Sequence, residues 1–167
     1  MNAYDPTDSV TRPKDSYHPN LNYFNVGIGE LDGKKDFGNE THSNALDIKK
    51  LTTLINENGD RHKSITYLKM DVEADELRCY NQWLKSGIFK DVEQLGIEMH
   101  LGNHSIKKNE IKRVYKDLIK FVQTLDKDYG LRLVGYNPNL CIGSDMDWQR
   151  IHQSFHDLLF VRPVKLF

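Results

Sequence analysis

The sequence predicts an α/β fold in which a mostly parallel sheet is covered by helices and closed by an antiparallel hairpin near the C-terminal end. Strand patterns alternate with helix patterns over the first 130 residues, an order typical of parallel strands joined by crossover helices. Two further strand patterns follow with no helix pattern between them, which predicts the hairpin. The 167 residues suit a single domain over residues 1–167.

The first half of the chain predicts a loop, a strand and a helix. Residues 7–20 contain two prolines and many turn-forming residues, which is typical of an irregular loop. Residues 21–29 predict a short strand that ends at glycines. Residues 43–59 predict a helix with Ser43 as its N-cap and Gly59 at its end. The helical spacing of apolar residues predicts an inward face of Ile48, Leu51 and Ile55.

The second half predicts two more helices among four strands. Strands are expected over residues 64–70, 92–101, 131–137 and 156–162. A helix over residues 75–87 ends at Gly87, and its inward face is expected to comprise Leu77, Tyr80 and Leu84. The most regular helix pattern covers residues 108–130 and ends at Gly130. Its apolar face is expected to comprise Ile111, Val114, Tyr115, Leu118, Val122 and Leu125.

Composition and charge exclude several classes of function. The 23 basic and 24 acidic residues give a net charge of -1, so there is no basic footprint for nucleic acid or an anionic membrane surface. No apolar run approaches the roughly 20 residues of a membrane helix, and no targeting segment is recognisable, so the compartment stays open. Cys79 and Cys141 fit no metal-ligand spacing; we interpret them as buried thiols, with a disulfide as the alternative.

The glycines of "NVGIGELDG" resemble a dinucleotide-binding loop. Such a loop needs a helix directly after it, because the helix N-terminus binds the phosphate. The residues that follow Gly29 are polar and interrupted by Gly33, which does not fit a helix. We therefore interpret the glycines as a turn at the end of a strand.

Acidic residues follow the strand over residues 64–70, and three roles compete for them. Asp75 is interpreted as the cap of the next helix. Asp71 and Glu73 precede that cap, and their two-residue spacing directs both side chains to one side of an extended segment, so we expect them to line a ligand crevice at the sheet edge. The third role, metal coordination, involves the next strand as well.

Glu98 and His100 repeat the two-residue spacing at the end of that strand, with His104 nearby. Together with Asp71 they predict either a general base, with His100 as the proton acceptor, or a metal site formed by Asp71, Glu98 and His100. The alternative is that Glu98 and His100 form hydrogen bonds across neighbouring strands. The segment 137–150, which contains Trp148, is a candidate substrate loop.

Several motifs together resemble the methyltransferase-like 24 family, which is related to FkbM-type methyltransferases. They are "AYDPT", "FNVGIG", "YLKMDVEADELRCYNQWLKSGIF", "VEQLGIEMHL", "LVGYNPN" and "HDLLFVR", which cover nearly the whole chain. The resemblance implies a Rossmann-like class I methyltransferase fold, S-adenosylmethionine as cofactor, and an antiparallel strand hairpin at the C-terminal end of the sheet.

The resemblance also implies roles for individual residues. Asp5 would bind the cofactor ribose, and Gly29 and Glu30 would border the adenine. Asp71 and Glu73 would line the methionine and acceptor side, with His100 as the candidate base. The family has a glycine after the Asp-x-Glu acids, where this chain has Ala74.

The family pattern begins with a strand and a glycine-rich turn that have no counterpart before Asp5. The resemblance therefore implies an N-terminally truncated domain, for which we expect weak or no catalysis. The leading hypothesis is a methyltransferase that acts on an oxygen or nitrogen of an unknown small-molecule, sugar or protein acceptor. The alternatives are a non-catalytic remnant that serves as a binding module, and a metal-dependent hydrolase.

Overall fold

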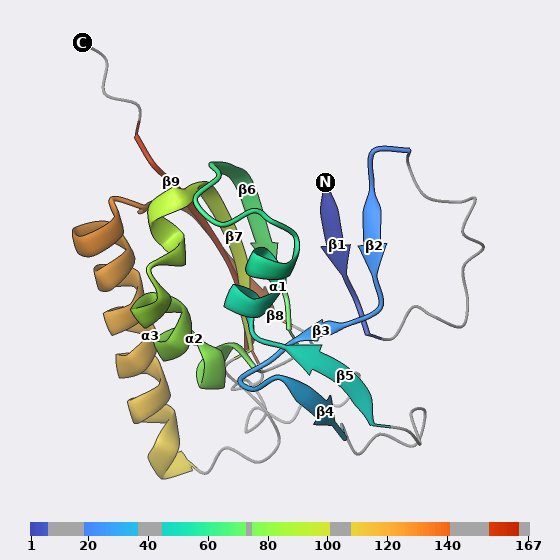
Figure 1. Ribbon diagram of the computed structural model, residues 1–167. Helices are drawn as coiled ribbons and strands as arrows, with labels where there is room; N and C mark the ends of the chain where they lie inside the picture. Colours follow the sequence, from blue (N-terminus) through green and yellow to red (C-terminus); the bar gives the residue numbers. More distant parts are fainter. Residues whose placement is uncertain (7–18, 37–44, 73–74, 101–107, 141–153, 164–167) are drawn as a thin grey trace. The chain divides into compact units, whose positions relative to one another are not determined.

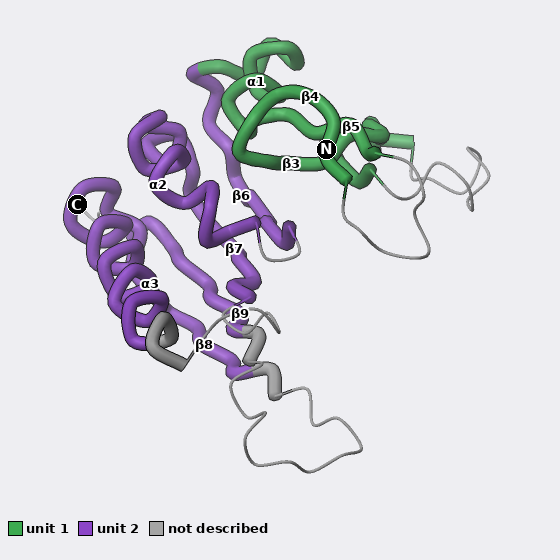
Figure 2. Tube along the Cα trace, turned by 90° about the horizontal axis from the view of Figure 1, so that it is seen from below, with its two compact units in different colours: residues 1–61 green, residues 62–167 purple. Residues whose placement is uncertain are grey.

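The computed structural model describes residues 1–6, 19–36, 45–72, 75–100, 108–140 and 154–163 (Figure 1). The chain divides into two compact units, Met1–Arg61 and His62–Phe167 (Figure 2). The described strands pair both parallel and antiparallel and are accompanied by α-helices, so the predicted α/β class is confirmed. The strands form three separate hydrogen-bonded sheets rather than one mostly parallel sheet.

The first unit contains two small sheets and one helix. Strand β1 (Asn2–Tyr4) pairs in parallel with β2 (Asn22–Phe24). In the other sheet β5 is central, parallel to β3 and antiparallel to β4. The bounds of these elements are β3 (Gly27–Ile28), β4 (Gly33–Lys35), β5 (Leu46–Lys49) and α1 (Leu51–Glu57).

The helix predicted over residues 43–59 is wrong in its first part, because Leu46–Lys49 forms strand β5. The backbone of β5 bonds to strands on both sides, and the β-branched Ile48 is buried there. Ser43 lies outside the described residues. The carboxylate of Asp32 instead accepts hydrogen bonds at the start of α1, from Lys50 N–H at 2.8 Å and Thr53 Oγ1 at 3.1 Å.

The predicted strand over residues 21–29 is divided into β2 and β3. The dinucleotide-loop interpretation stays excluded, because Gly33–Lys35 forms a strand where that loop needs a helix. Packing explains Gly29: a Cβ atom on this residue would lie 2.8 Å from Ile48 Cδ1.

The second unit is a four-stranded sheet in the order β6-β7-β9-β8. Strands β6 and β7 are parallel, and β9 is antiparallel to both of its neighbours, which confirms the predicted C-terminal hairpin. Helices α2 and α3 lie side by side against one face of this sheet (Figure 1). The bounds are β6 (Ile65–Met70), α2 (Glu76–Ser86), β7 (Val92–His100), α3 (Lys108–Tyr129), β8 (Arg132–Leu140) and β9 (Ser154–Val161).

The ends of both helices follow the glycine prediction. Gly87 and Gly130 adopt φ values of 75° and 65°, the left-handed region in which a glycine ends a helix without strain. The short 3-10 turn Ile88–Asp91 then leads into β7.

The core of the second unit lies between the helices and one face of the sheet. Phe121 of α3 is fully buried, and its ring meets those of Tyr80 and Phe89 edge-on, with ring centroids 5.9 and 6.2 Å away. Edge-on packing of this kind adds about 0.5–1.5 kcal/mol per pair beyond burial. The predicted face of α3 was partly wrong, because Tyr115 is 38% exposed and the buried Phe121 was not included. Cys79 is fully buried, as predicted for a core thiol.

The side chain of Arg162 links several elements at one end of this core by hydrogen bonds to their backbone carbonyl groups. Its Nη2 donates to Phe89 O at 2.8 Å, its Nε donates to Val92 O at 3.2 Å, and its Nη1 donates to Tyr129 O, near the C-terminal end of α3. One guanidinium therefore joins β9, β7, the 3-10 turn and α3.

Among the described residues, no helix combines the length and the apolar character needed to cross a bilayer.

Replacing Arg162 with Met should destabilise the second unit by about 2–3 kcal/mol, because several part-buried carbonyl groups lose a charged donor. Urea unfolding followed by circular dichroism measures this loss. Arg132→Met is the matched control: Arg132 is 70% exposed and pairs with Asp126 at 3.7 Å, so less than about 1 kcal/mol is expected. Equal losses in the two variants would contradict the role of Arg162.

Candidate functional site

The candidate site lies at the carboxyl ends of the parallel strands β6 and β7. Asp71 directly follows β6, and His100 is the last residue of β7. Between them along the chain, Glu76 is the first residue of α2. Because the two strands are parallel and adjacent, their ends meet at one sheet edge, where ligands of α/β proteins commonly bind.

Glu76 is fully buried and organises this edge. Its Oε1 accepts a hydrogen bond from Val72 N–H at 2.8 Å and lies 3.1 Å from Nδ1 of His100. A carboxylate only accepts, so this contact assigns the ring hydrogen to Nδ1 of a neutral His100. Glu76 thereby fixes both the orientation and the tautomer of His100.

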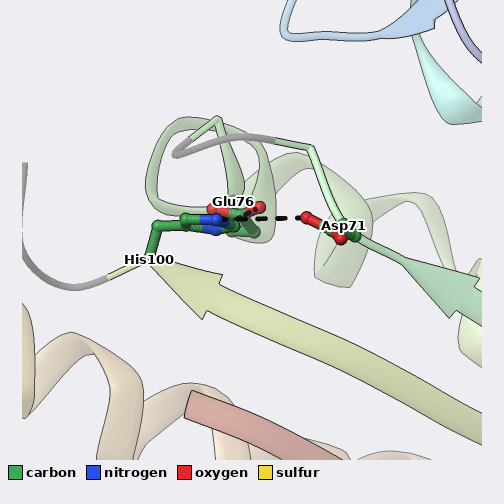
Figure 3. A group of neighbouring side chains, drawn as sticks. All are labelled: Asp71, Glu76 and His100. Carbon is green, nitrogen blue, oxygen red and sulfur yellow. Dashed lines mark hydrogen bonds and ion pairs between the residues drawn. The ribbon is translucent and has the colours of Figure 1, made fainter. Parts of the chain in front are cut away.

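Asp71 completes the cluster from the more open side. One of its carboxylate oxygens lies 4.0 Å from Nε2 of His100, and its side chain is 41% exposed, against 8% for His100. Figure 3 shows the three side chains converging from the end of β6, the start of α2 and the end of β7. Each offers one ligand atom, and these three atoms lie within 4.8 Å of one another.

Glu98 adds a further acid next to the cluster. Desolvation raises the pKa of its carboxyl group, and the nearby Asp71 raises this pKa further by its charge and by a hydrogen bond; the charge of Asp157 acts in the same direction. Lys69 Nζ lies 4.0 Å from the Glu98 carboxylate. Negative charge is thus concentrated at this edge.

The predicted cap role of Asp75 is wrong for its side chain. Asp75 occupies the N-cap position of α2, but its carboxylate makes no capping hydrogen bond, and its backbone is in the helical region. It lies 3.8 Å from the Arg78 guanidinium instead. The acid whose side chain bonds to other residues at this edge is therefore the next one, Glu76.

The structure brings together part of the predicted site. Asp71, Glu98 and His100 lie at one edge, as their positions after adjacent strands implied. The group with metal-ligand geometry contains Glu76 in place of the predicted Glu98. Glu73, His104 and Trp148 lie outside the described residues.

Three predicted cofactor-binding residues belong to the first unit. Asp5 follows β1, and its backbone N–H donates to Phe24 O at 3.1 Å while its own carbonyl accepts from Tyr23 Oη at 2.8 Å. Gly29 donates its N–H to Lys49 O at 2.9 Å, and Glu30 next to it is exposed.

Sequence reasoning missed Glu76. An acid in the first turn of a helix is ordinarily explained by the helix dipole, so the position of Glu76 in the sequence did not predict that its side chain is buried. Its partner His100 lies 24 residues away in sequence, and only the pairing of β6 with β7 brings them together.

Replacing Glu98 with Gln should make the protein more stable at neutral pH. The pKa of Glu98 is higher in the folded state than in the unfolded state. As pH rises from the unfolded-state pKa through the folded-state pKa, ionisation of Glu98 therefore lowers the free energy of unfolding. We expect the urea midpoint of Glu98→Gln to exceed that of the wild type at about pH 7 and to match it at about pH 4, near the ordinary pKa of glutamate.

Glu93→Gln serves as the control for this measurement. Glu93 lies on the same strand, is exposed, and accepts a hydrogen bond from Ser64 Oγ at 2.6 Å, which an amide can also accept. Its urea midpoint should stay close to that of the wild type at about pH 7. A pH-independent effect of Glu98→Gln would contradict the raised pKa of Glu98, to which desolvation and the neighbouring Asp71 both contribute.

Comparisons of the chain with protein-family models, curated protein sequences and solved structures found no match. A functional assignment therefore depends on the site itself and on the motifs described above.

Proposed function

We propose that this chain is an S-adenosylmethionine-dependent methyltransferase domain that acts on an oxygen or nitrogen atom of an acceptor. The observation that carries the proposal is the edge formed by β6 and β7, where Asp71, Glu76 and His100 converge. The strand order β6-β7-β9-β8, with its C-terminal hairpin, supports it, because the resemblance to the methyltransferase-like 24 family implies such a hairpin.

The residues of the first unit suit the cofactor chemically. Asp5 carries a partly exposed side chain at the end of a strand, and one carboxylate can accept hydrogen bonds from the two adjacent hydroxyl groups of a ribose. Glu30 could contribute a further acceptor beside the adenine. Gly29 contributes by allowing the backbone to pass close to Ile48.

The Glu76–His100 pair is suited to remove a proton from the acceptor. When bound, S-adenosylmethionine would supply an activated methyl group, so the protein mainly has to orient the acceptor and take up its proton. With the hydrogen on Nδ1 directed to Glu76, Nε2 is the proton-accepting nitrogen of His100. Asp71, 4.0 Å from Nε2, would orient the acceptor and stabilise the imidazolium that forms.

Binding of S-adenosylhomocysteine tests this proposal directly. Isothermal titration calorimetry should give a dissociation constant in the micromolar range, and Asp5→Ala should weaken binding by about 10- to 100-fold, the range expected for lost hydrogen bonds to a charged group. Asp47→Ala is the matched control, since Asp47 is 63% exposed and pairs only weakly with Lys34, at 3.8 Å.

The absence of binding by the wild-type chain would overturn the proposal and favour a non-catalytic binding module. Equal weakening by Asp5→Ala and Asp47→Ala would contradict the role of Asp5. Circular dichroism spectra of the three proteins establish that each is folded before the titrations are compared.

A further inference from the structure

Glu76 has an unsatisfied oxygen at the centre of the candidate site. Its Oε1 is engaged by Val72 N–H and by His100, whereas its Oε2 is buried and has no hydrogen-bond partner among the described residues. A buried carboxylate oxygen without a partner costs several kcal/mol unless a proton or a cation compensates it.

The charge around this oxygen is mainly negative. Asp71 and Glu76 contribute two carboxylates, and Glu98 lies close enough to Asp71 for the two acids to interact. Among the described residues, the cationic groups that ion-pair contacts place at this edge are Lys69, which lies 4.0 Å from Glu98, and His100 when it is protonated. A divalent cation would balance this charge.

We propose that Asp71, Glu76 and His100 bind a divalent cation, either Zn²⁺ or Mn²⁺. Imidazole and carboxylate ligands together suit both ions, and three protein ligands leave coordination positions for a substrate or water. The ligands of Zn²⁺ lie about 2.0–2.2 Å from the ion, so two ligand atoms up to about 4.4 Å apart can share it. The 4.0 Å between Asp71 and Nε2 of His100 meets this condition, and the group as a whole, whose atoms lie within 4.8 Å of one another, needs only a small side-chain movement to close around an ion.

Burial prepares the site for an ion. Glu76 and His100 have side chains that are 0% and 8% exposed, so packing already fixes two of the three ligands. The contact of Nδ1 with Glu76 Oε1 fixes the ring, and Nε2 lies 4.0 Å from Asp71. Asp71, at 41% exposed, can move to close the coordination sphere.

The cation would change how the proposed methyl transfer handles the acceptor's proton. With Nε2 occupied as a ligand, His100 would no longer take the proton; a hydroxyl group that reaches the ion would have a lowered pKa and would release its proton to water. The inference itself does not depend on methyl transfer, since ion binding is measured on the chain alone.

Titration with Mn²⁺ tests the site. The electron paramagnetic resonance signal of free Mn²⁺ should disappear with a stoichiometry of one ion per chain, and the thermal unfolding midpoint should rise with Mn²⁺ concentration. Asp71→Asn and Glu76→Gln should each weaken binding by about 10-fold or more. Displacement of the bound Mn²⁺ by one equivalent of Zn²⁺ would identify zinc as the preferred ion, and retention would identify manganese.

Asp126→Asn is the matched control, because Asp126 lies on α3, is 56% exposed and pairs with the exposed Arg132. It should bind Mn²⁺ like the wild type. If Glu76→Gln fails to fold, the exposed Asp71→Asn variant still decides the question. Absence of Mn²⁺ and Zn²⁺ binding, or binding that Asp71→Asn leaves unchanged, would overturn the inference. Loss of S-adenosylhomocysteine binding with intact ion binding would overturn only the proposed function.

Discussion

A buried carboxylate needs hydrogen-bond donors nearby, because it has lost its contacts with water. The candidate site depends on the donors that the fold provides for the buried Glu76. The backbone of Val72 and the ring of His100 supply the two donors to Oε1. These contacts join the segment after β6, the first turn of α2 and the last residue of β7. Because Asp71 and Glu98 are close neighbours of these points in the chain, their positions at the edge follow from the same contacts.

Strand β7 connects this edge to a second charged group at its other end. The carbonyl oxygen of Val92, the first residue of β7, accepts hydrogen bonds from the Arg162 guanidinium, and His100, the last residue, contacts Glu76. The apolar residues between them are buried against the helices: Leu95, Ile97 and Met99. The central strand is therefore anchored by polar contacts at both ends and by hydrophobic packing along its length, which gives the site residues a rigid base.

Local patterns predicted the second unit well and the first unit less well. The glycine stops at Gly87 and Gly130 act locally, so sequence alone located both helix ends. Residues 46–49 were misassigned because the spacing of Ile48 and Leu51 fits a helix, whereas the residues that pair with this strand in β3 and β4 lie 11 or more positions away in sequence. In the site, the two-residue spacing of Glu98 and His100 at the end of their strand correctly predicted that both lie at the edge near Asp71. Glu76 was missed because burial of an acid is a property of tertiary packing.

Strand β8 is an outer strand of the four-stranded sheet, and its irregular pairing with β9 affects how readily a strand of another molecule could pair with it. The register shifts between Leu133 and Gly135, and Pro138 lacks an N–H group. Tyr136 stacks on His156 and bonds to its Nδ1 at 2.8 Å, which ties β8 inward. An outer strand with a register shift and a missing N–H donor is a poorer template for a strand from another molecule, which disfavours pairing through the segment that exposes Val134 and Tyr136.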